Sequence, residues 1–124
     1  MRFWTIVFGL AAAFNLVVGL PLLFAPAAFY AAIGQPPPPD ILSSQMVGLL
    51  VAVFGVGYVM VARAPARNRN ILWLGVLGKT PLPLITWLSI QAGRTPMDGL
   101  WLTLVDLVFV ALFLTYLLRH PKSA

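Results

Sequence analysis

The stretch ILWLGVLGKTPLPLITWLSIQA, Ile71 to Ala92, decides how this chain folds. It is long enough to cross a bilayer as a helix, which takes about 20 apolar residues, yet it carries Lys79 followed by Pro81 and Pro83. Proline has no N–H, so these two prolines leave helical carbonyl oxygens without their usual donors. In hydrocarbon such oxygens need other polar partners. The stretch therefore predicts a membrane-spanning helix that is broken just beyond Lys79, with polarity concentrated at one depth.

The composition of the chain is that of an integral membrane protein. Of its 124 residues, 60% are hydrophobic and 9% are charged, and the mean hydropathy is +0.94. Soluble domains carry about 25% charged residues. Cysteine is absent, which excludes disulfides and thiol chemistry. At this length we expect one membrane domain, residues 1–124.

Apolar segments of similar length make up most of the chain. They predict four transmembrane helices, at about 3–24, 41–62, 70–92 and 100–118. The segments lack the alternation of barrel strands and are longer than the roughly 10 residues of such strands. The sequence therefore predicts an all-α, polytopic membrane protein, a four-transmembrane-helix bundle. Helix contacts should use small residues, which let backbones approach in a membrane: Gly9, Ala12, Ala13, Gly19, Gly48, Gly55, Gly57, Gly75 and Gly78.

The basic residues predict how the chain is oriented. If the chain crosses four times, Arg94 lies on one side, and six basic residues lie on the other: Arg2, Arg63, Arg67, Arg69, Arg119 and Lys122. The positive-inside rule then places both termini in the cytoplasm. The net charge of +5 is thus a topology signal, with weak attraction to anionic headgroups as a by-product. We expect no nucleic-acid binding, because no basic patch interleaved with aromatic residues lies outside the membrane.

Two connecting segments carry local signals. Residues 26–34, PAAFYAAIG, predict a short helix in the membrane interface, with Phe29 and Tyr30 at headgroup level. Asp40 and Asp98 stand just before the second and fourth predicted spans. Aspartate is a preferred N-cap residue, so we expect each to cap the helix that follows it.

Each predicted span carries a polar residue, and these are the candidate site residues. A lysine or aspartate at a helix centre costs about 2.5–3.5 kcal/mol on insertion scales, so Lys79 and Asp106 should turn inward and pair. Counted from the outer ends of their spans, the two lie about 10 Å apart along the membrane normal, so direct contact requires a stretched lysine or a deformed helix. The expected polar interior comprises Lys79, Asp106, Asn15, Gln45 and Thr80, with Pro81 and Pro83 as the kink.

Three interpretations of this region are open: a structural proline kink, an ion pair that only fixes helix register, and a functional polar site. Signs of catalysis are weak, because Asp106 has no carboxylate partner in the core and His120 lies beyond the last span. The GKT at 78–80 is no phosphate-binding loop, since Trp73 stands where that motif needs glycine. We expect no catalytic residues and no metal site, and a non-enzyme is favoured without excluding an intramembrane enzyme that acts on a lipid-like substrate.

Four stretches together resemble the small four-helix DoxX-like membrane proteins: FNLVVGLPLLFAPAAFY (14–30), SQMVGLLVAVFGVGY (44–58), ILWLGVLGK (71–79) and LVDLVFVALFLTYL (104–117). The resemblance covers nearly the whole chain. It implies a four-helix bundle, and for some relatives it implies association with quinone-linked oxidoreductases of the membrane. We place the chain in the cytoplasmic (inner) membrane of a bacterium. From the resemblance we also expect one shared interior, faced by Asn15, Gln45, Lys79 and Asp106.

Two classes of function remain open at this stage. The first is an accessory subunit or binding module that holds a lipid, a quinone or a partner membrane protein. The alternative is a small proton-coupled transporter, suggested by a broken helix beside membrane charges and working as an oligomer. The expected partners are membrane lipids and either a partner membrane protein or further copies of this chain. No cofactor is expected, apart from a bound lipid or quinone.

Overall fold

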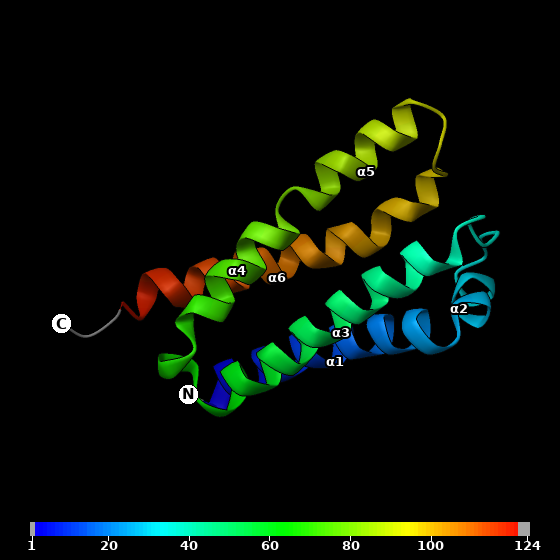
Figure 1. The fold of residues 1–124 in the computed structure, drawn as a ribbon. Helices are drawn as coiled ribbons and strands as arrows, with labels where there is room; N and C mark the ends of the chain where they lie inside the picture. Colours follow the sequence, from blue (N-terminus) through cyan, green and yellow to red (C-terminus); the bar gives the residue numbers. More distant parts are fainter. Residues whose placement is uncertain (1, 122–124) are drawn as a thin grey trace. The chain divides into compact units, whose positions relative to one another are not determined.

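The structure, a computed structural model, describes residues 2–121 of the chain. These residues are helical, with turns and loops between helices and no strand (Figure 1). Four helical segments are long and apolar enough to cross a membrane: Arg2–Phe24, Ile41–Arg63, Arg69–Gln91 and Met97–Arg119. The prediction of an all-α chain with four apolar spans is therefore confirmed. Of the basic residues that predicted its orientation, Lys122 lies outside the described residues.

By its internal contacts the chain divides into two compact units, with the boundary between Pro65 and Ala66. The first unit is a helical hairpin of α1 (Arg2–Phe24) and α3 (Ile41–Arg63), which pack side by side (Figure 1). The short helix α2 (Pro26–Ala32) lies at the end where the hairpin turns and contacts both long helices. The predicted short helix is thus present, and Gly34, at φ 71°, ends it in the left-handed conformation that glycine tolerates.

Glycines set the closest approach between α1 and α3. A Cβ on Gly19 would lie 2.5 Å from the backbone nitrogen of Ala52, and one on Gly48 would lie 2.7 Å from the backbone nitrogen of Leu23. No side chain fits at either position while the two backbones stay where they are. The expectation that small residues make this helix contact is confirmed at these two sites. Gly9, in contrast, has open space around it.

The two predicted aspartate caps have different outcomes. Asp40 is the N-cap of α3 and accepts a hydrogen bond from the backbone N–H of Ser43, so that prediction is confirmed. The cap predicted at Asp98 is wrong, because the N-cap of α6 is Gly99 and no side chain caps that helix. Asp98 lies instead within η2 (Met97–Gly99), a 3-10 turn that precedes the helix and changes the position of the cap.

The second unit is built on α6 (Leu100–Arg119), against which α4 (Arg69–Lys79) and α5 (Leu82–Gln91) both pack. The third span is therefore two helices, and the path of the chain bends between them (Figure 1). This confirms the predicted break just beyond Lys79. Before α4 the chain forms a 3-10 turn, η1 (Pro65–Arg67). After α5 it turns at Gly93, whose φ of 74° is again left-handed.

Arg69 ties the start of α4 to the end of α6. Its guanidinium donates hydrogen bonds to the carbonyl oxygen of Leu117, at 3.1 Å, and to that of His120. The last carbonyl groups of a helix have no partner within that helix, so a cation that bonds to them is doubly favourable. The contact fixes the two helices as antiparallel neighbours, with the first turn of α4 beside the last turn of α6.

Candidate functional site

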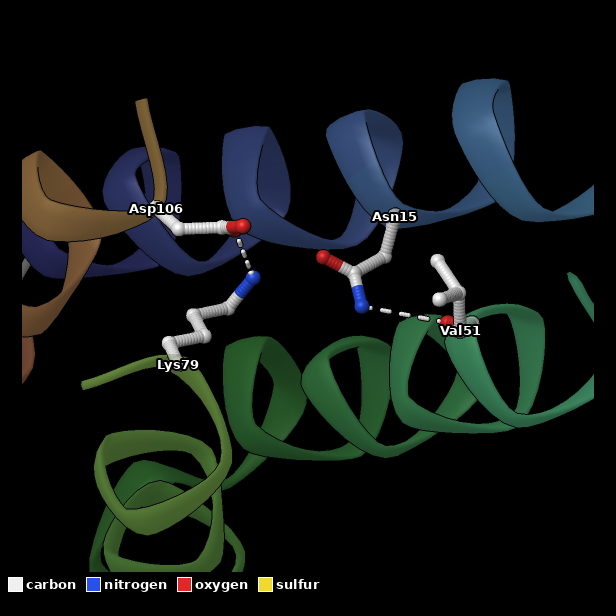
Figure 2. Close-up of polar contacts among 4 residues, drawn as sticks. All are labelled: Asn15, Val51, Lys79 and Asp106. Carbon is white, nitrogen blue, oxygen red and sulfur yellow. Dashed lines mark hydrogen bonds and ion pairs between the residues drawn. The ribbon is translucent and has the colours of Figure 1, made fainter. Parts of the chain in front are cut away.

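An ion pair between Lys79 and Asp106 lies within the second unit. The Nζ of Lys79 is 2.5 Å from Oδ1 of Asp106, and the two residues are 7% and 8% exposed. Figure 2 shows the lysine side chain extended toward the carboxylate. The predicted inward pairing of these two residues is confirmed.

The two charged residues are placed by matched faces of α4 and α6. On α4 the buried residues recur at helical spacing, at Leu72, Gly75 and Lys79. On α6 they do the same: Thr103, Asp106, Val110, Phe113, Tyr116 and Leu117. Residues three and four apart share one side of a helix. Lys79 and Asp106 therefore lie on the buried faces of α4 and α6, which are otherwise largely apolar.

The offset of about 10 Å, counted from the outer ends of the spans, meant that direct contact would require a stretched lysine or a deformed third span, and the structure shows both (Figure 2). Counted from the other ends of the helices, the heights of the two residues agree more closely. Lys79 is ten residues beyond Arg69, and Asp106 is eleven residues before Leu117, which Arg69 contacts. At 1.5 Å per residue these spacings correspond to about 15 and 16.5 Å. The two side chains consequently stand at nearly the same level. The offset counted from the outer ends of the spans includes the break between α4 and α5, whereas this count does not.

The break begins immediately after the lysine. Thr80 donates its hydroxyl to the carbonyl oxygen of Val76, at 2.5 Å, and its backbone N–H bonds to the same oxygen, at 3.0 Å. The structure therefore places Thr80 on the exposed surface, bonded to its own helix and not to the ion pair. Pro81 precedes the first residue of α5 and Pro83 follows it, positions where a helix needs no N–H donor.

The same prolines interrupt the hydrogen-bond ladder of the third span just beyond Lys79. A continuous helix would supply N–H groups from residues 81 and 83 to the carbonyl oxygens of Leu77 and Lys79, and proline cannot donate either bond. An aromatic ring adds to the surroundings, because the Nζ of Lys79 is 6.0 Å from the centroid of Phe109. That distance is the outer limit of a cation–π contact. The ammonium group of Lys79 thus has both a carboxylate and an aromatic ring near it.

The other two predicted polar residues belong to the first unit. Asn15, 5% exposed, donates from Nδ2 to the carbonyl oxygen of Val51, at 3.1 Å (Figure 2). Gln45 donates from Nε2 to the carbonyl oxygen of Leu23, also at 3.1 Å. Both side chains tie α1 to α3. The interior that Asn15 and Gln45 were expected to share with the ion pair stays a prediction, since the pair lies in the second unit.

Sequence reasoning missed two polar contacts. Tyr30, predicted as a headgroup anchor, shares a hydrogen bond of 2.9 Å with Ser44, which is 6% exposed. Arg69 was predicted only as part of the positive side of the membrane, but it bonds to the end of α6. Neither contact has a sequence signal, because each joins residues from different helical elements without a motif between them.

The chemistry available at the ion pair is hydrogen bonding and proton exchange. A lysine ammonium has three donors, and a carboxylate accepts at about four positions, so Asp106 retains acceptor capacity beyond its contact with Lys79. Among residues 2–121 no cluster of three or more histidine, aspartate or glutamate side chains is placed to hold a metal ion. The site therefore offers paired charges and backbone carbonyl groups.

Comparison with protein-family models, with curated proteins and with solved structures finds no match for this chain. The function proposed below accordingly rests on the geometry of the site and on the sequence.

Proposed function

We propose that this chain is an accessory subunit or binding module of a membrane, which holds a lipid, a quinone or a partner membrane protein at Lys79 and Asp106. The observation that carries the proposal is the buried ion pair at the break between α4 and α5. An ionised side chain within a membrane span is costly and marks a functional site by default.

The alternative, in which the ion pair of Lys79 and Asp106 only fixes helix register, explains the structure less well than a binding site does. Well-packed apolar residues replace a buried ion pair without loss of stability in many proteins. Arg69 already fixes the register of α4 against α6 through Leu117 and His120. A polar group that accepts a hydrogen bond from Lys79 or donates one to Asp106 fits this pair, as does the oxygenated head of a quinone or lipid.

We further propose that the chain lies in the cytoplasmic membrane of a bacterium, with both termini in the cytoplasm. The asymmetry of the basic residues supports this orientation. The resemblance to the DoxX-like proteins supports the same setting and favours a quinone-linked partner over a soluble one.

The binding proposal is tested by purification in a mild detergent followed by native mass spectrometry and analysis of extracted small molecules. We expect wild type to retain a lipid, a quinone or another chain. The double variant Lys79→Met with Asp106→Leu removes both charges together and should lose the retained species while it stays folded. Asp98→Asn, which changes an exposed carboxylate in η2, is the control and should retain it. A wild-type chain that always runs alone and empty contradicts the proposal.

A second candidate function is a proton-coupled transporter that works as an oligomer. The broken third span beside a carboxylate and an ammonium group favours it, because discontinuous helices frame the binding sites of many transporters. Proteoliposome flux of wild type, Lys79→Ala and Asp106→Asn separates this candidate from a binding module. Flux that requires both side chains supports transport, and equal flux in all three proteins removes it.

A further inference from the structure

A cavity of about 240 Å³ opens at the start of α4, within the second unit. Ala66, Arg67, Arg69, Asn70 and Trp73 line it. Its volume is below the roughly 300–1,000 Å³ of sites for drug-sized molecules, so it suits a small polar group. Arg69 stands ten residues before Lys79 on the same helix, which is about 15 Å along the axis. The cavity is therefore separate from the ion pair.

The two arginines of the cavity have different roles. Arg69 is held by its bonds to the carbonyl oxygens at the end of α6. Arg67 is exposed, and its guanidinium has no hydrogen-bond or ion-pair partner within residues 2–121. The side-chain amide of Asn70 likewise makes no hydrogen bond within that range. The cavity thus combines a fixed cation with two side chains that can still donate.

Among residues 66–121, the described part of the second unit, no side-chain carboxylate lines this cavity. The chain has three acidic residues in total. Within the second unit, Asp106 is paired with Lys79, and Asp98 lies before the opposite end of α6 from the carbonyl groups that Arg69 contacts. The lining residues of the cavity are therefore suited to an anion that comes from outside this part of the chain.

We propose that this cavity binds a phosphate group, carried by an anionic phospholipid of the surrounding membrane. The planar guanidinium of an arginine matches phosphate oxygens with two parallel hydrogen bonds. Trp73, 46% exposed, belongs to a residue type enriched at headgroup level. Basic side chains just outside a span attract anionic headgroups. A soluble phosphate ester offers the same chemistry, and Trp73 at the edge of a membrane span favours the lipid.

Native mass spectrometry of the detergent-solubilised chain, titrated separately with dioleoyl phosphatidylglycerol and with glycerol 3-phosphate, tests the proposal. We expect wild type to bind the lipid saturably and glycerol 3-phosphate at least tenfold more weakly. Loss of a charge-assisted contact at Arg67→Gln should weaken lipid binding roughly tenfold. Arg67→Lys keeps the charge but not the planar guanidinium group. Its affinity for the lipid should therefore lie between those of wild type and Arg67→Gln.

The matched control is Arg119→Gln, which removes a positive charge at the end of α6 without changing a residue that lines the cavity. It should weaken lipid binding less than twofold, and all variants should keep the wild-type thermal midpoint. Equal weakening by Arg67→Gln and Arg119→Gln would mean general attraction of charge and would overturn the site. Absence of saturable lipid binding, or tighter binding of glycerol 3-phosphate, overturns it as well.

Discussion

Lys79 and Asp106 are joined at 2.5 Å across α4 and α6, at the level set by the bonds from Arg69 to the far end of α6. The pair and the bonds of Arg69 are thus two separate polar contacts between the same two helices. Each contact satisfies a different need. Arg69 bonds to the end of a helix, whereas Lys79 and Asp106 neutralise each other within helical segments that are long and apolar enough to cross a membrane. The predictions below separate these roles.

The ion pair should reveal itself as non-additivity. Lys79→Met leaves a buried carboxylate without its cation and should lower the free energy of unfolding by about 3–5 kcal/mol. Adding Asp106→Leu removes the stranded charge and should restore a large part of that loss. Equilibrium unfolding of the four proteins of this double-mutant cycle in detergent gives the coupling energy. Losses that simply add would show that the two side chains do not interact.

Arg69→Gln should loosen the alignment of α4 with α6. The variant removes the charge-assisted bonds to the carbonyls of Leu117 and His120, each worth about 1.5–3 kcal/mol when the group is charged. Thermal unfolding should shift down, and amide hydrogen exchange should accelerate in the last turn of α6. Arg67→Gln, a neighbouring arginine without these bonds, is the control and should leave both measurements unchanged. Equal effects of the two variants would show that the bonds from Arg69 to the end of α6 do not align the two helices.

The close contact between α1 and α3 should not tolerate a side chain at Gly48. Gly48→Ala places a methyl group against backbone atoms near Leu23, at distances that real contacts do not reach, so the helices must separate at a cost of about 1–3 kcal/mol. Gly9→Ala is the matched control in the same hairpin, because nothing lies within 4 Å of its added carbon. It should be neutral or stabilising, by up to about 1 kcal/mol of helix propensity. Similar losses from both variants would contradict the packing.

The cap of α3 should respond to acid. Hydrogen bonds from the side chain and then the backbone of Ser43 lower the pKa of Asp40 below its ordinary value of 3.8. Because the pKa is depressed in the folded chain, the stabilisation is complete above the ordinary pKa and is lost as pH falls through the folded one. The protection of the Ser43 amide, measured by hydrogen exchange from pH 6 down to about pH 2 and corrected for the intrinsic exchange rate at each pH, should therefore fall below the ordinary range of a carboxyl group. Asp40→Asn keeps a capping oxygen without the titration and should abolish that acid response.

Much of this fold can be predicted from local chemistry, and the differences between prediction and structure come from tertiary geometry. Span number follows from apolar length, and the break after Lys79 follows from the missing N–H of Pro81. The pairing with Asp106 follows from the cost of charge in hydrocarbon. The offset along the membrane normal was counted from the ends joined through η2, so that count includes the break between α4 and α5. The prediction that Asp98 caps the last span is wrong because a 3-10 turn intervenes before α6.

The orientation of the chain is open to a direct test, because the sequence contains no cysteine and needs no background substitutions. Single cysteines at Ala66→Cys and Thr95→Cys lie in connections at the two ends of the third span. With both termini in the cytoplasm, Thr95→Cys faces the outside and should react with a membrane-impermeant maleimide in intact spheroplasts. Ala66→Cys should react only after lysis, which also controls for its accessibility. The reverse pattern would invert the topology and place the phosphate cavity on the outer face, whereas labelling of both in intact spheroplasts would contradict a third span that crosses the membrane.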